Sequence, residues 1–139
     1  YADFLDNHPP SVLTDIHNRH PDKFIISTEA CAGASSNKGV LLGSYERAEE
    51  YARSIIEDLN NFVVGWTDWN MALNPDGGPT WVKNYVDSTI IVMAETDEFV
   101  KQPTYYALAH FSKFIKPGAH RVSLVAQDDL PEGVQMLGV

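Results

Sequence analysis

The stretch from residue 24 to residue 66 decides the fold: it opens with FIIST (24–28) and closes with FVVGW (62–66). Both runs are short, almost continuously apolar and rich in β-branched residues, which is typical of strands that a parallel sheet buries on both faces. Between them, Ser44 is placed to cap a helix whose apolar residues recur at helical spacing. Those residues are Tyr51, Ala52, Ile55, Ile56 and Leu59. The stretch therefore predicts a strand, a helix and a second, parallel strand.

A helix is also predicted on each side of this unit. The upstream helix covers residues 11–20 and ends at Pro21. The downstream helix covers residues 103–115, because proline is tolerated in the first turn of a helix. The residues expected to face inward are Val12, Leu13 and Ile16 upstream, and Ala107, Leu108, Phe111, Phe114 and Ile115 downstream. Alternating helices and strands of these lengths indicate an α/β architecture.

Two strands are too few for a stable sheet with a helix on each, so we expect the chain to be a piece of a larger fold, such as the last quarter of a β/α barrel. Residues 67–99 form a loop too long for a plain connection, and loops of that length are usually functional. After Gly118 the character changes, and residues 121–126 (RVSLVA) predict a strand of another kind.

Composition and charge exclude several classes of function. The net charge is −9 and the basic residues are scattered singly, so we expect no nucleic-acid partner. The single cysteine, Cys31, excludes an internal disulfide and a cysteine-based metal site, and the five histidines lack metal-ligand spacing. We therefore expect no metal and no cofactor. No apolar run is long enough for a transmembrane segment.

The first candidate for chemistry is Glu29, which directly follows FIIST at the carboxyl end of a presumed barrel strand. In β/α barrels the active site lies at that end of the strands, and the small residues after Glu29 leave room for a ligand. The alternative is a strand-end glutamate that meets solvent or caps the next helix. Position alone leaves both interpretations open.

The second candidate is GWTDWN (65–70), at the end of the other strand. Indole rings stack on the apolar face of a sugar, and the Asp68 carboxylate can accept hydrogen bonds from sugar hydroxyls. Strand alternation places Trp66 and Asp68 on one side and Trp69 on the other. The alternative is that one tryptophan belongs to the core and the other lies beneath the loop. Further along, Asn74-Pro-Asp-Gly-Gly indicates a turn, and Asn84 and Tyr85 could reach a ligand over the barrel mouth.

At STEACAG (27–33) and GWTDWNMALNPDGGP (65–79) the chain resembles glycoside hydrolase family 30, and within it the lysosomal glucosylceramidases of animals. The likeness extends from YADFL (1–5) to about residue 126. It implies a (β/α)8 barrel, from the end of strand 6 to helix 8 over residues 1–118, with the start of an attached β-sandwich over residues 119–139.

The resemblance also implies roles for individual residues. Glu29 corresponds to the nucleophile, and Tyr1 to a tyrosine that hydrogen-bonds to it. Trp69 corresponds to a tryptophan of the glucose pocket, Asn84 to a residue that contacts the sugar hydroxyls, and Tyr85, less directly, to an aromatic residue of the entrance loop. The implied activity is retaining hydrolysis of glucosylceramide to glucose and ceramide, in the lysosome and at a membrane surface, with a saposin-type activator as a candidate partner.

This chain departs from the family in one chemical respect. The family's acid/base glutamate lies in an Asn-Glu-Pro stretch, and no such tripeptide occurs here. We therefore expect a fragment that contains the nucleophile only and that is inactive alone. The alternatives are a family relative that acts on other β-glucosides or β-1,6-glucans, or a sugar-binding module without catalysis.

Overall fold

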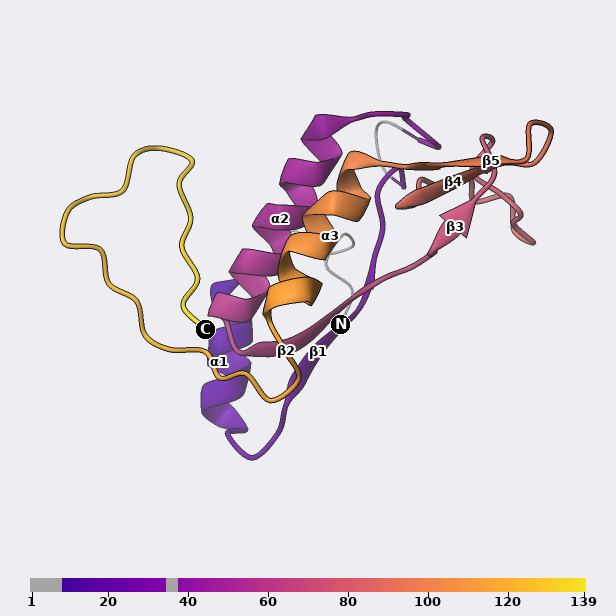
Figure 1. The fold of residues 1–139 in the computed structure, drawn as a ribbon. Helices are drawn as coiled ribbons and strands as arrows, with labels where there is room; N and C mark the ends of the chain where they lie inside the picture. The colour runs from indigo at the N-terminus through magenta and orange to yellow at the C-terminus, as the bar shows by residue number, and fades with distance from the viewer. Residues whose placement is uncertain (1–8, 35–37) are drawn as a thin grey trace.

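The computed structural model describes residues 9–34 and 38–139. These residues form three helices and two small sheets (Figure 1). Their order along the chain is α1 (Ser11–Arg19), β1 (Ile25–Ala30), α2 (Tyr45–Asn60), β2 (Val63–Asp68), β3 (Ala72–Leu73), β4 (Ile90–Met93), β5 (Glu98–Lys101) and α3 (Pro103–Phe114). The helices α2 and α3 lie side by side next to β1 and β2, while β3, β4 and β5 lie beyond one end of the helices.

The predicted strand–helix–strand unit is confirmed. β1 and β2 pair in parallel, and α2 connects them. Ser44 caps α2 as expected, because its hydroxyl accepts a hydrogen bond from the Arg47 N–H at 3.4 Å. The predicted flanking helices also form, within one residue of their expected ends.

Helix α2 buries a stripe of residues at spacings of three and four. The stripe consists of Arg47, Tyr51, Ile55 and Asp58. Tyr51 meets Trp66 of β2 edge to face, with ring centroids 5.1 Å apart, and Trp66 donates a hydrogen bond from Nε1 to the Ser54 hydroxyl at 3.0 Å. Trp66 is thus a packing residue between β2 and α2.

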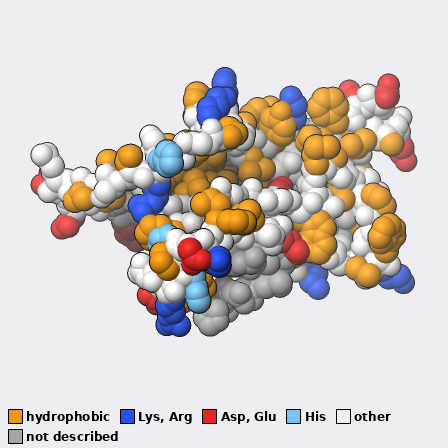
Figure 2. All heavy atoms as spheres, turned by 90° about the horizontal axis from the view of Figure 1, so that it is seen from below, with side chains coloured by type: hydrophobic (Ala, Val, Ile, Leu, Met, Phe, Trp, Pro, Cys, Tyr) orange, Lys and Arg blue, Asp and Glu red, His pale blue; other side chains and the backbone are white. Residues whose placement is uncertain are grey.

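The other face of the two-stranded sheet is open. Ile26 of β1 is 37% exposed and Val64 of β2 is 65% exposed. Figure 2 shows hydrophobic side chains over much of the face seen from below. Parallel sheets are ordinarily covered on both faces. These strands therefore carry apolar side chains that the described part of the chain leaves uncovered.

Much of the long loop forms a sheet of its own. β4 pairs in parallel with β3 and antiparallel with β5. Ile91 of β4 is fully buried and packs with Leu73 and Val86 in a small hydrophobic core. The expectation of an irregular loop was wrong here, because strands of two and four residues are too short to give a readable periodicity.

Three further expectations were wrong. Residues 121–126 do not form a strand; a single bridge joins Val122 to Gly138. A strand requires a partner along its length, and the described chain supplies none there. Two residues expected to face inward from α1, Val12 and Ile16, are 37% and 43% exposed, and Phe114 at the end of α3 is 69% exposed. Helical spacing aligned these side chains on apolar faces that the described residues leave uncovered.

No helix in the described part of the chain has the length and apolar character needed to span a bilayer.

Candidate active site

Glu29 lies where β1 changes register. Ser27 pairs with Trp66 and Ala30 with Asp68, so that Thr28 and Glu29 of β1 together face a single residue of β2. Such bulges re-aim a side chain and are over-represented next to active sites. Glu29 is partly exposed, whereas Ser27 and Ala30 on either side of the bulge are buried. The bulge interrupts the regular alternation of β1 at this carboxylate.

The end of β2 is joined to β1 immediately after Glu29. The Trp69 N–H donates a hydrogen bond to the Ala30 carbonyl at 2.9 Å, and Ala30 follows Glu29 in the chain. The Trp69 side chain is 48% exposed. The structure therefore brings the backbone of Trp69 to the residue next to Glu29, with the indole free to contact a ligand.

Asp68 is turned toward helix α2. Its Oδ1 accepts hydrogen bonds from the Tyr51 hydroxyl at 2.9 Å and from the Trp69 N–H at 2.9 Å. Its Oδ2 is buried and has no hydrogen-bond partner among the described residues. The predicted sharing of one face by Trp66 and Asp68 is confirmed, since both contact α2. On this face Asp68 is hydrogen-bonded to helix α2 through the Tyr51 hydroxyl.

Burial raises the pKa of Asp68 from 3.8 to about 6, with a further contribution from the charge of Asp87; the hydrogen bonds from Tyr51 and Trp69 act in the opposite direction. Burial, followed by the Asp68 charge, raises the pKa of Tyr51 far above its ordinary value. Tyr51 consequently keeps its proton and remains the donor to Asp68 throughout the physiological pH range.

Cys31 lies among the acidic groups. Burial raises the pKa of its thiol to about 12, and the charges of Asp68, Glu29 and Asp87 act in the same direction. The thiol donates to the Ala32 carbonyl at 3.3 Å. A thiol with so high a pKa is a poor nucleophile, and Cys31 packs against the small hydrophobic core of Leu73, Val86 and Ile91. Its surroundings also show that three carboxylates lie close to this strand end.

Asn84 and Tyr85 lie on a segment that is attached just beyond Glu29. The Asp87 N–H donates to the Ala32 carbonyl at 2.9 Å. Asn84 and Tyr85 are both exposed and line a hollow of about 400 Å³ together with Ala34, from the segment that follows β1. The structure thus places both predicted residues beside the chain that follows Glu29. Tyr1, the remaining predicted site residue, lies outside the described residues.

A buried polar cluster holds that segment in place, and sequence reasoning missed it. The Arg47 guanidinium forms an ion pair with Asp87, and the Gln102 amide donates to the same carboxylate. Arg47 also donates to the Gly39 carbonyl at 2.9 Å, and Gln102 to the Ser88 carbonyl at 2.8 Å. Arg47, Asp87 and Gln102 are each less than 7% exposed. One signal was available in the sequence: Arg47 lies four residues before Tyr51, on the apolar side of α2.

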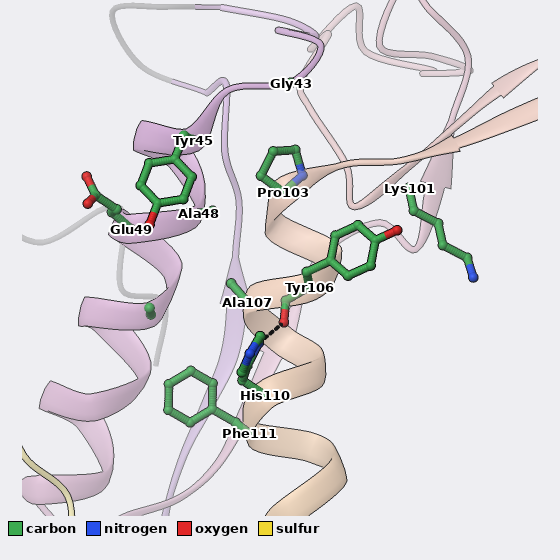
Figure 3. Close-up of a pocket in the computed structure, with 11 residues that line it drawn as sticks. Gly43, Tyr45, Ala48, Glu49, Lys101, Pro103, Tyr106, Ala107, His110 and Phe111 are labelled. Carbon is green, nitrogen blue, oxygen red and sulfur yellow. Dashed lines mark hydrogen bonds between the residues drawn. The ribbon is translucent and has the colours of Figure 1, made fainter.

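A larger hollow, of about 660 Å³, lies between α2 and α3 (Figure 3). Its walls are largely apolar, and Figure 3 shows Tyr45, Pro103, Tyr106 and Phe111 around it. None of the predicted site residues lines it. The described residues also contain no group of three His, Cys, Asp or Glu side chains that could bind a metal ion.

Comparisons with known proteins show which family the chain resembles. The model of the glycosyl hydrolase family 30 TIM-barrel domain matches residues 1–115. Putative glucosylceramidase 4 of Caenorhabditis elegans is 52% identical over 124 residues, which cover 89% of this chain and 24% of the relative. Lysosomal acid glucosylceramidase of Mus musculus is 49% identical over 129 residues, which cover 92% of this chain and 25% of the relative. The chain spans about a quarter of the length of these relatives.

Two solved structures are similar to the chain. SrfJ from Salmonella typhimurium matches with a TM-score of 0.72 and 27% identity, covering 83% of this chain and 25% of that chain. An endo-beta1,6-glucanase matches with a TM-score of 0.68 and 26% identity, covering 88% of this chain and 27% of that chain. With the family model matched over most of its residues, this chain belongs to glycosyl hydrolase family 30.

Proposed function

We propose that this chain supplies the nucleophile side of the active site of a retaining β-glucosidase that hydrolyses glucosylceramide. The observation on which the proposal rests is the placement of Glu29 in a bulge at the carboxyl end of β1, with Trp69 hydrogen-bonded to the next residue. The identities of 44–56% to relatives named glucosylceramidase support the substrate.

In the proposed mechanism, a Glu29 carboxylate oxygen attacks the anomeric carbon of the glucoside. A second carboxyl group, outside this chain, protonates the departing ceramide oxygen and then activates the water that releases glucose. Retention requires the two carboxyl groups to lie roughly 5–5.5 Å apart. Tyr1 donates a hydrogen bond to Glu29, which stabilises its charged form. Trp69 stacks on the sugar, while Asn84 and Tyr85 contact it from the segment attached at Ala32.

Replacing Glu29 by Gln in the full-length protein tests the nucleophile. Glutamine keeps the size of the side chain and removes its nucleophilic oxygen, so turnover of glucosylceramide should fall by at least about a thousandfold. Glu49→Gln is the matched control, because Glu49 is exposed on α2. Activity of Glu29→Gln within tenfold of the wild type would remove Glu29 from this role.

Asp68 was also predicted to bind substrate. Because its Oδ1 is occupied by two donors from the protein, we assign it a supporting position behind Trp69. Its assignment as a sugar ligand remains a prediction.

The 139-residue chain alone is proposed to be inactive, because no Asn-Glu-Pro stretch is present to supply the acid/base group. Loss of a general acid slows a reaction by typically 10²–10⁴-fold, and an incomplete pocket slows it further. Release of ceramide by the isolated chain, followed by mass spectrometry, would contradict this proposal.

The similarity to the lysosomal enzyme of Mus musculus supports a lysosomal location, in sphingolipid metabolism. A lipid substrate is met at a membrane surface, where a saposin-type activator is a candidate partner. Fractionation that recovers the full-length protein away from lysosomal markers would contradict the location.

The second candidate substrate class is β-1,6-glucan, favoured by the likeness to an endo-beta1,6-glucanase. The identity of 26% to that structure is half of the 52% to a relative named glucosylceramidase. Parallel assays of the full-length protein on both substrates discriminate between them: we expect glucosylceramide to be hydrolysed faster.

A binding module without catalysis is the remaining alternative. It predicts reversible sugar binding at the Trp69 surface and no covalent reaction with a cyclitol epoxide.

A further inference from the structure

A closed chain of hydrogen bonds runs through helix α2 and back to the strand that bears Glu29. The Ala32 N–H donates to the Tyr51 hydroxyl at 3.2 Å, and that hydroxyl donates to Asp68 Oδ1 at 2.9 Å. The Trp69 N–H donates both to Asp68 Oδ1 and to the Ala30 carbonyl, each at 2.9 Å. The ring of contacts therefore begins and ends on residues 30 and 32, directly after Glu29.

The Tyr51 side chain is held firmly enough to define this geometry. It is 5% exposed, and its ring packs edge to face on Trp66 with centroids 5.1 Å apart. Trp66 is itself fixed to α2 by the hydrogen bond to Ser54. Because packing fixes the aromatic ring, the hydroxyl has a single position from which it reaches both Ala32 and Asp68.

The Tyr51 hydroxyl links the two strand ends directly. The hydroxyl of Tyr51 satisfies one donor after β1 and one acceptor at the end of β2. Asp68 Oδ2 has no hydrogen-bond partner among the described residues, so Oδ1 accepts the hydrogen bonds that orient this carboxylate. Without the Tyr51 hydroxyl, Asp68 would keep the Trp69 N–H alone among these donors, and the buried Ala32 N–H would lose its acceptor.

We propose that Tyr51 is a positioning residue whose hydroxyl sets the placement of Glu29 relative to Trp69 by joining Ala32 to Asp68. The inference rests on the proposed function, in which Glu29 attacks a sugar that Trp69 contacts. Tyr51 acts from behind the strand ends and touches no substrate. A misplacement of about 1 Å between reacting groups can slow a reaction on the order of a hundredfold.

The test measures turnover per active site in the full-length protein. A cyclitol epoxide titrates the active sites by covalent attachment at Glu29, and the turnover of a fluorogenic β-glucoside is divided by that number. Tyr51→Phe removes only the hydroxyl, and we expect the turnover per labelled site to fall ten- to hundredfold. Tyr45→Phe is the matched control, because Tyr45 is a 68% exposed tyrosine of the same helix; its turnover should equal that of the wild type.

Two variants of Asp68 separate positioning from stability. Asn at this position still offers an oxygen to both donors but buries an unpaired amide, so Asp68→Asn should lower the melting temperature yet keep more turnover per labelled site than Asp68→Ala. In Asp68→Ala the turnover per labelled site should fall as far as in Tyr51→Phe. Both changes break the same closed chain of hydrogen bonds. The double variant Tyr51→Phe/Asp68→Ala should therefore turn over no more slowly than Asp68→Ala.

Turnover per labelled site within twofold of the wild type in Tyr51→Phe would overturn the inference, and so would full additivity in the double variant. If Tyr51→Phe does not fold, the comparison of Asp68→Asn with Asp68→Ala decides the matter. Failure of the proposed function is visible separately, because the wild type itself would then show no label at Glu29.

Discussion

At the scale of single residues, Asp68 has an unusual environment for a carboxyl group. Two hydrogen-bond donors converge on one of its oxygens, and the other oxygen is buried without a partner among the described residues. Burial raises its pKa from 3.8 to about 6, despite the two donors. Folding therefore favours the protonated form of Asp68.

This shift makes stability depend on pH. Between about pH 4 and pH 6 the folded state retains a proton that the unfolded state has released, so the contribution of Asp68 to the free energy of unfolding falls as the pH rises. The shift corresponds to at most about 3 kcal/mol. Urea unfolding of the full-length protein and of Asp68→Asn across this range should show the free energy of the wild type falling relative to the variant. A constant difference between the two would contradict the assignment.

Sequence reasoning located Glu29 and the neighbourhood of Trp69 but could not orient the side chains around them. Strand alternation put Trp66 and Asp68 on one face, but it did not indicate that this face packs on α2, where Asp68 accepts a hydrogen bond from Tyr51. Orientation here depends on register shifts in both strands, and a shift of one residue moves side chains to the opposite face. Nothing in the local pattern of apolar residues reports such a shift.

At the scale of elements, the strand–helix–strand unit was predictable because its signals are long and agree with one another. Helix α2 has 16 residues, a serine cap and a regular apolar stripe. The sheet formed by β3, β4 and β5 was not predictable, since its strands are short and come from distant parts of a turn-rich loop. The polar cluster of Arg47, Asp87 and Gln102 connects these two parts: it joins α2, the segment before β4 and the N-terminus of α3.

We expect this cluster to stabilise the segment that bears Asn84 and Tyr85. Replacing Arg47 by Ala leaves Asp87 buried without its cation, and breaking a buried ion pair in this way typically costs about 3–5 kcal/mol. Chemical unfolding of the full-length protein measures the loss. Arg53→Ala is the control, because Arg53 is exposed on the same helix and should change stability by less than about 0.5 kcal/mol. Equal effects of the two substitutions would contradict a structural role for the cluster.

At the scale of the whole molecule, the sheet of β1 and β2 has helices on one side and an open apolar face on the other. Two parallel strands do not form an independently stable sheet. The family model describes a TIM barrel, in which further strands cover such a face. We propose that this chain attains its folded state as part of such a barrel, with residues 119–139 leading into a β-sandwich.

The isolated 139-residue chain should therefore unfold without a cooperative transition. Circular dichroism during heating measures this: we expect a gradual loss of helix signal, because the exposed apolar face is not covered. A sharp melting transition of the monomeric chain would show that it folds alone.

If Glu29 is the nucleophile of a retaining glucosidase, as we propose, a cyclitol epoxide should react with its carboxylate. Peptide mass spectrometry of the full-length protein after this reaction identifies the residue that is modified. We predict one covalent adduct, on the peptide that contains Glu29, and no adduct in Glu29→Gln. Attachment at another residue, or binding that is reversed by dialysis, would mean that Glu29 is not the nucleophile.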